Sequence, residues 1–503
     1  LDRVRAAKKP VLSWAIVYTD DGVMLASHAS EVWVDPLGGA VVAGPGGNRL
    51  YFGDLLRRLD VNARVYKVGT YKSAVEPYTL DGMSEPAREN YTQLYGALWS
   101  EWQAHVAKAR PKVRLGDATR DPAAWFAAAG GDAATAAKNA GLVDTLGDKI
   151  AFGKRVAALA GEDEWSEAPG AYAATKLDAW LADNPLPDAG EAIGVVTIAG
   201  EIVDGKAGPG TAGGERIAKL LDEALEDDLK GLVVRVDSPG GSVMASEEIR
   251  RAIQRHKAKG IPVAVSMANV AASGGYWVAT PAQRIFAEPE TITGSIGIFA
   301  VVPTFERAAA KWGVASDGVK TTPLSGEPDL VGGLSPAADA LLQSYVTDGY
   351  GDFLRRVAQA RKMTPARVDE VGQGRVWDGG AARQVGLVDQ YGGLDDALEW
   401  VAGQAKLADG EWHARFLGEE ARATDTLLRR WLVGDDSGRE AHDLVGTLAA
   451  RREDALSRLA GDLARLTGTR GMQAYCLECA PLARTPAPRA LEGWLAKLAA
   501  LFG

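Results

Sequence analysis

The fold is decided by one stretch of the chain, Ile261-Pro-Val-Ala-Val-Ser-Met-Ala-Asn-Val-Ala-Ala-Ser273-Gly-Gly-Tyr-Trp-Val-Ala-Thr280. Its first half is apolar and rich in β-branched residues, which predicts a buried parallel strand. The residues from Tyr276 onward suit a helix, so Ser273 lies at a sharp turn between the two elements. Its hydroxyl projects from this turn. Gly274 and Gly275 leave room beside it for another backbone, and the amides that follow point toward an oxyanion that would develop there.

A second strand and helix precede this stretch. Gly231-Leu-Val-Val-Arg-Val-Asp237 predicts another parallel strand, and a helix is expected from about Val243 to Lys257. Between them lies Ser238-Pro-Gly-Gly241-Ser242, where the amide of Gly241 is a second candidate oxyanion donor. Strands that alternate with helices indicate an α/β fold with parallel sheets flanked by helices.

The uncharged run from Gly260 to Gln283 is long enough to suggest a transmembrane helix. Pro262, Asn269 and the glycine pair after Ser273 argue against that reading. A buried strand followed by a tight turn explains the run better.

Four motifs carry a family resemblance: Tyr71-Lys72-Ser-Ala-Val-Glu-Pro77, Asp237-Ser-Pro-Gly-Gly-Ser242, Ala272-Ser273-Gly-Gly-Tyr-Trp277 and Thr293-Gly-Ser295-Ile-Gly297. Over roughly residues 5–405 the chain resembles the signal peptide peptidase A family of serine proteases, in its double-length bacterial form. The resemblance implies a fold similar to Clp protease and crotonase, and a Ser-Lys dyad that cuts remnants of signal peptides in the membrane.

The resemblance also implies the roles of single residues. Ser273 is the expected nucleophile, Lys72 the base and Ser295 the residue that orients the lysine amine, with the amides of Gly241 and Gly274 as oxyanion donors. Neither a cofactor nor a metal is expected. Peptide substrates, a homotetramer and a bacterial inner-membrane location facing the periplasm are expected, with a membrane anchor outside this chain.

Two copies of one α/β unit are visible in the sequence. Glu31-Val-Trp-Val-Asp-Pro36 matches Arg284-Ile-Phe-Ala-Glu-Pro289, and Ala140-Gly-Leu-Val-Asp144 matches Val385-Gly-Leu-Val-Asp389. Each copy keeps one half of the dyad, which predicts a composite site. We expect a first repeat at 1–165 that lacks its N-terminal part, a linker at 166–192, a second repeat at 193–407 and a mostly helical extension at 408–503. A helix is expected over 85–109, and an amphipathic helix over 456–466.

The choice of base has alternatives. No histidine lies between Ser273 and Trp412, so a Ser-His triad is disfavoured, and a desolvated lysine can replace the imidazole. Lys320 is the nearest alternative base. The alternative interpretation of Lys72 is a surface lysine without a catalytic role. We expect Glu76 to point away from the amine, because contact would stabilise the ammonium form.

Two further motifs resemble functional sites, but we predict no catalytic or cofactor-binding role for either. Gly208-Pro-Gly-Thr-Ala-Gly213 imitates a dinucleotide fingerprint, but the strand ends at Val203, too early for the tight turn that such a site needs. It is interpreted as a loop at the rim of the cleft. Cys476 and Cys479 are the only cysteines, so the chain cannot build a four-thiolate zinc site. A disulfide or an inert structural pair is favoured over a redox centre.

Composition narrows the function classes. The chain has 503 residues, 47% of them hydrophobic, which allows two or more domains with large cores. Its formal net charge of −10 gives no basic surface for nucleic acid. Two rivals to the protease remain: a crotonase-like acyl-CoA enzyme, which needs no serine after the strand, and a catalytically inactive scaffold of the same fold.

Overall fold

The computed structural model of the chain describes residues 1–208, 210–418 and 471–479. The described residues fall into two compact units: unit 1 with residues 1–47 and 95–186, and unit 2 with residues 48–94, 187–418 and 471–479. Residues 48–94 carry Lys72, so the segment with the predicted base belongs to the same unit as Ser273. The division into repeats at 165 and 193 stays a prediction.

Unit 1 contains a three-stranded parallel sheet in the order β1-β2-β4. The apolar side chains of β2 pack with those of α8 and the end of α5 in one core, where Val32, Val34 and Val106 are fully buried. The elements of this unit are α1 (Asp2–Ala6), β1 (Leu12–Tyr18), α2 (Asp20–Ser27), β2 (Glu31–Ala40), α6 (Leu115–Arg120), α7 (Pro122–Ala128), α8 (Ala133–Asn139), β4 (Thr145–Leu146), α9 (Lys149–Ala160) and α10 (Leu177–Asp183). Helix α5 (Glu85–Ala109) begins in unit 2 and ends in unit 1.

Unit 2 is built on an eight-stranded sheet whose central strands are parallel. β8 (Gly231–Ser238) pairs with β5 (Glu191–Ala199) on one side and with β10 (Val263–Ala272) on the other. The main path is β14-β12-β10-β8-β5-β16, and β11 and β15 extend it from β10. The other strands of this sheet are β11 (Arg284–Ala287), β12 (Ile292–Gly294), β14 (Val376–Asp378), β15 (Gln390–Tyr391) and β16 (Trp412–Phe416).

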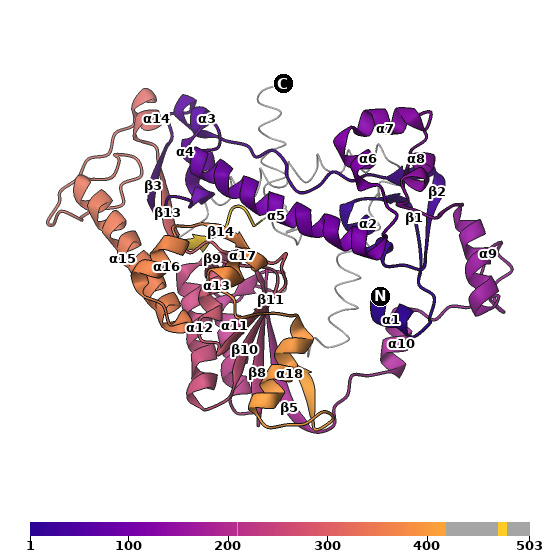
Figure 1. Cartoon of the computed structure of the whole chain (residues 1–503). Helices are drawn as coiled ribbons and strands as arrows, with labels where there is room; N and C mark the ends of the chain where they lie inside the picture. The colour runs from indigo at the N-terminus through magenta and orange to yellow at the C-terminus, as the bar shows by residue number, and fades with distance from the viewer. Residues whose placement is uncertain (209, 419–470, 480–503) are drawn as a thin grey trace. The chain divides into compact units, whose positions relative to one another are not determined.

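Helices cover both faces of this sheet (Figure 1). α11 (Gly214–Ala224) and α12 (Val243–Ala258) pack on one face, where Leu221 and Ile249 share a core with Val234. α18 (Leu394–Gln404) packs on the other, where Val401 meets Val233. Because both faces are covered, the central strands are mainly apolar, and Arg235 and Asp237 of β8 interrupt this pattern.

A second sheet of unit 2 has the order β3-β13-β17-β9-β6-β7. β3 (Asn62–Val68) pairs antiparallel with β13 (Ile298–Thr304) along its whole length, from Asn62 opposite Thr304 to Val68 opposite Ile298. β17 (Gln473–Tyr475) lies between β13 and β9 (Gly240–Ser242), antiparallel to both. β6 (Ile202–Val203) and β7 (Ala212–Gly213) complete the sheet, so the end of the glycine-rich loop 208–213 is a strand.

The predicted fold class is confirmed, with parallel sheets flanked by helices. The expected helices appear as α5 and α12, and the uncharged run 260–283 forms β10 and the short helix α13 (Gly274–Ala279). Within the predicted C-terminal extension, the described residues contain the strands β16 and β17; the segment 456–466 lies outside the described residues. The remaining helices are α3 (Gly53–Arg58), η1 (Ser73–Val75), α4 (Glu76–Thr79), α14 (Glu306–Lys311), α15 (Pro336–Arg361), α16 (Pro365–Val371) and α17 (Gly379–Gln384).

Within residues 1–208, 210–418 and 471–479, no helix is both long enough and apolar enough to cross a membrane.

Candidate active site

Ser273 joins β10 to α13 in a backbone conformation that non-glycine residues rarely adopt, with φ +56° and ψ −111°. Such a conformation costs of order 1–3 kcal/mol and persists where the surroundings fix it. Here the Ser273 amide donates to the carbonyl of Gly294 at 2.8 Å, and its carbonyl accepts from the Trp277 amide at 2.9 Å. The turn therefore holds the hydroxyl free of the α13 cap, in the manner of a nucleophile elbow.

Lys72 reaches the same point from the segment between β3 and η1. Its Nζ lies 2.9 Å from Ser273 Oγ, 2.9 Å from Ser295 Oγ and 3.1 Å from the Ser295 carbonyl oxygen. The side chain is 1% exposed. Burial disfavours the ammonium form and lowers the pKa of Lys72 to about 7. A large fraction of the amines is therefore neutral near pH 7.

Backbone pairing explains how residues 201 positions apart in the chain meet. The β3–β13 ladder ends at Val68 and Ile298, which leaves Lys72 and Ser295 just beyond the same end of the ladder. A loop at Gln373–Arg375 then joins the two segments: the Tyr71 amide donates to the Gln373 carbonyl, and the Gly374 amide donates to the Ile296 carbonyl, both at 2.8 Å.

Gly374 allows this close approach of three segments. A Cβ added to it would lie 2.6 Å from the Lys72 backbone nitrogen, and its φ of +78° also disfavours other residues. No local pattern in Gln373–Arg375 indicates a role, so this loop was not predicted from the sequence.

The two glycine loops predicted to supply oxyanion donors are adjacent. A Cβ added to Gly240 would lie 2.4 Å from the Gly274 amide nitrogen, so the chain passes Gly274 closely just before it reaches Gly241. The structure thus brings the loops of Gly241 and Gly274 together at Ser273. Their role as oxyanion donors stays a prediction.

Two carboxylates lie near the lysine segment, and only one of them was anticipated. Glu76 points away from the amine, as expected, because its carboxylate accepts hydrogen bonds from the Ser84 hydroxyl at 2.5 Å and the Ser84 amide at 3.2 Å. Glu478 was not predicted from the sequence. Burial raises its pKa, and its charge favours the ammonium form of Lys72. Its carboxylate accepts a hydrogen bond from the Ser73 hydroxyl.

Comparison with known proteins identifies the family. The family model described as "Peptidase family S49" matches residues 3–162 and 255–408. The chain belongs to peptidase family S49. The two matched segments agree with a tandem arrangement. Membership of this family identifies the protein as a serine protease, which confirms the prediction from the sequence.

Named S49 relatives resemble most of the chain. "Protease 4" of Salmonella typhi is 37% identical over 95% of this chain and 77% of its own length. "Protease 4" of Haemophilus influenzae is 33% identical over 95% of this chain and 78% of its own length. Among solved structures, ClpP1 from Listeria monocytogenes has 17% sequence identity and a TM-score of 0.28, covering 41% of this chain and 94% of its own.

Two other sets of residues singled out from the sequence take no part in the contacts of the Lys72 amine. Lys320, the rival base, is half exposed and forms an ion pair with Glu327 at 3.6 Å. Cys476 and Cys479 form a disulfide, one of the two readings favoured from sequence.

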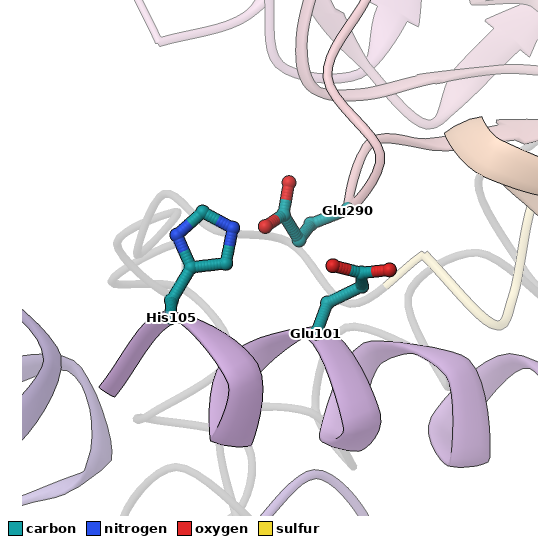
Figure 2. Close-up of side chains that lie close together, drawn as sticks. All are labelled: Glu101, His105 and Glu290. Atoms are coloured by element: carbon teal, nitrogen blue, oxygen red, sulfur yellow. The ribbon is translucent and has the colours of Figure 1, made fainter. Parts of the chain in front are cut away.

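Figure 2 shows Glu101 and His105 on neighbouring turns of α5 with their side chains on the same side of the helix. Both belong to unit 1, whereas Glu290, the third labelled side chain, belongs to unit 2. Two ligands from one helix do not by themselves make a metal site, and we assign none to this S49 chain.

Proposed function

We propose that this S49 protease hydrolyses peptide bonds with a Ser-Lys dyad in which Ser273 is the nucleophile and Lys72 the general base. The observation that carries the proposal is the 2.9 Å contact between Lys72 Nζ and Ser273 Oγ. A buried lysine whose pKa is about 7 is half neutral at pH 7, so it can accept the serine proton.

Ser295 supports this role as a positioning residue. A neutral amine has two N–H bonds, and the hydroxyl and carbonyl oxygens of Ser295 are two acceptors for them at 2.9 and 3.1 Å. The lone pair of Nζ is then left for Ser273 Oγ. Ser295 thereby favours the orientation in which Lys72 acts as a base.

The reaction follows from these positions. Lys72 takes the proton of Ser273 as Oγ attacks the peptide carbonyl, and the amides of Gly241 and Gly274 stabilise the oxyanion. The ammonium of Lys72 then gives its proton to the leaving amine, which breaks the peptide bond and leaves an acyl-serine. Lys72 then takes a proton from water as the water oxygen attacks the acyl carbon, the bond from that carbon to Ser273 Oγ breaks, and Lys72 returns the proton to Oγ.

The proposed substrates are cleaved signal peptides and other short or unfolded peptides at the bacterial inner membrane, on its periplasmic side. Resemblance to signal peptide peptidase A supports the substrate. The Cys476–Cys479 disulfide supports an oxidising compartment. A homotetramer is also proposed from the resemblance; light scattering on the intact protein is expected to give a mass above that of the monomer, and a fully active monomer would contradict the assembly.

Active-site labelling tests the dyad directly. We expect a fluorophosphonate to add its mass to Ser273 in the parent protein, and Ser273→Ala to lose both labelling and peptide hydrolysis while it stays folded. Ser344→Ala, at an exposed position on α15, is the matched control and keeps both. An acyl-CoA enzyme of the same fold or an inactive scaffold would not label, and full hydrolysis by Ser273→Ala would reject the protease mechanism.

A further inference from the structure

The proposed catalytic groups are closed off from solvent. Ser273 and Ser295 are 0% exposed, and Lys72 is 1% exposed. A peptide carbonyl must reach Ser273 Oγ before any attack can occur. Whatever covers this serine therefore has to move when a substrate binds.

Segment 471–479 contains the short strand β17 (Gln473–Tyr475) and lies beside the glycine loops of the site. Its strand β17 runs antiparallel to β9, with Ala474 opposite Gly241. Backbone hydrogen bonds flank this pair: the Val243 amide donates to the Met472 carbonyl at 3.1 Å, and the Cys476 amide donates to the Pro239 carbonyl at 2.8 Å. The segment therefore pairs along the strand that carries a predicted oxyanion donor.

The other edge of β17 is also occupied, because Gln473 pairs with Phe299 of β13. Backbone groups of the segment thus meet strands on both sides, as those of an extended peptide do when it adds to a sheet. β9 precedes Ser273 and β13 follows Ser295 in the chain, so the space between these two strands, which we call the peptide groove, is where we expect a substrate peptide to bind.

The carbonyl of Ala474 lies where a substrate carbonyl is expected. A Cβ added to Gly240 would lie 2.1 Å from this carbonyl oxygen, and a Cβ added to Gly274 would lie 3.1 Å from it. The oxygen therefore sits between the two glycine loops. An acyl group that binds between these loops competes with this oxygen for the same space.

Side-chain contacts hold the segment in place. Arg49 Nη2 donates to the Leu477 carbonyl at 2.7 Å, and the Ser73 hydroxyl donates to Glu478. The Cys476–Cys479 disulfide closes the turn that contains Glu478. The Glu478 carboxylate also favours the ammonium form of Lys72, which cannot act as a base.

We propose that residues 471–479 are a built-in competitive inhibitor, a strand of the chain itself that lies in the peptide groove with the Ala474 carbonyl at the oxyanion amides. The inference rests on the proposed function and adds a regulation to it: a peptide substrate must displace the segment. β9 keeps its pairing with β6, and β13 keeps its pairing with β3, when the segment leaves.

The variant Ala474→Arg tests this inference in the full chain. Ala474 is fully buried, so a guanidinium does not fit and the strand is expected to leave the groove. The KM for a short fluorogenic peptide then falls and kcat/KM rises about tenfold, because a larger fraction of the molecules is open. Ala310→Arg, the same substitution at an exposed position of α14, is the matched control and leaves both constants unchanged.

A peptide added in trans supplies the second arm. The disulfide-closed nonapeptide with the sequence of residues 471–479 is expected to inhibit Ala474→Arg competitively, whereas a scrambled peptide of the same composition does not. Absence of inhibition by the native sequence, or a folded Ala474→Arg protein with lowered kcat/KM, would overturn the inference and make the segment a permanent wall of the site.

A third arm does not depend on the folding of Ala474→Arg. Because Cys476 and Cys479 are the only cysteines of the chain, a reductant acts on this disulfide alone. The double variant Cys476→Ser, Cys479→Ser is expected to have a higher kcat/KM than the parent, and reductant is expected to leave that value unchanged. Equal kcat/KM values for the double variant and the parent would reject the inference. Failure of the proposed function is distinguished by fluorophosphonate, since no variant would then label at Ser273.

Discussion

Replacing Lys72 by methionine removes the proposed base and keeps most of the aliphatic stem. Lys72 is 1% exposed and its amine has three contacts, to Ser273 Oγ and to both oxygens of Ser295. General-base catalysis contributes about 10²- to 10⁴-fold. We therefore expect Lys72→Met to lose at least about a hundredfold in kcat without losing its fold.

The same substitution changes stability in a direction that depends on pH. Burial lowers the pKa of Lys72 from 10.5 to about 7. Each pKa unit corresponds to about 1.4 kcal/mol, so burial of this amine lowers the free energy of unfolding by up to about 5 kcal/mol near neutral pH. Between pH 7 and 10.5 the folded state binds fewer protons than the unfolded state, and the stability of the parent rises with pH. Lys72→Met lacks this term, so its gain in Tm over the parent is largest at pH 7 and below and shrinks toward pH 10.5.

Activity is expected to follow the neutral fraction of Lys72. With a pKa of about 7, roughly a tenth of the amines are neutral at pH 6 and roughly nine tenths at pH 8, so kcat/KM of the parent rises about tenfold between these values. The assay is hydrolysis of a fluorogenic peptide from pH 5.5 to 9.5, with thermal melts of parent and variant in the same buffers.

Lys320→Met is the matched control, since Lys320 is half exposed and forms an ion pair with Glu327. It is expected to keep the rate and the pH profile of the parent. If Lys72→Met turned over peptide at near the parent rate, or if Lys320→Met abolished turnover, the dyad would be wrong.

Two further predictions concern Ser295, which contacts the Lys72 amine, and Glu247, a buried carboxylate that contacts Trp277 of α13. Ser295→Ala removes one acceptor of the Lys72 amine and is expected to lower kcat about ten- to a hundredfold with little change in KM; steady-state kinetics check this, and a change confined to KM would argue against a positioning role. Burial alone would raise the pKa of Glu247, but hydrogen bonds that include those from Trp277 and Arg356 outweigh it and hold that pKa at about 2. Glu247→Gln is expected to lose about 3 kcal/mol of folding free energy at pH 7. This loss relative to the parent shrinks as the pH falls from 4.5 toward 2, because the ionised carboxylate stabilises the fold only above that range. Thermal melts in which the variant differs from the parent equally at pH 7 and pH 3 would contradict this.

The central sheet could be predicted because its strands are buried on both faces. β8 and β10 read as apolar runs, and each ends in a turn marked by glycine, so strand, turn and helix follow from local pattern. The long helix α5 was predicted from its start, where Ser84 precedes Glu85 and Pro86. Local sequence determines such elements because their burial and capping involve neighbouring residues.

The meeting of Lys72 and Ser273 could not be derived from local pattern. It depends on the ladder between β3 and β13, which joins segments far apart in the chain, and only the family motifs pointed to it. Glu478 and Gly374 were missed for the same reason. Each acts through contacts with segments remote in sequence, and neither has a neighbouring pattern that would predict its partners.

The pairing of β3 with β13 has a consequence for biosynthesis. Translation delivers the lysine segment first, and the dyad cannot assemble until the chain has been made through Thr304, the last residue of β13. A ribosome-bound fragment that ends before Ser273 holds the lysine without the serine, and one that ends between Ser273 and Thr304 lacks the complete ladder that brings the two together. For the dyad proposed above, the division between distant segments means that an unfinished chain is inactive during synthesis.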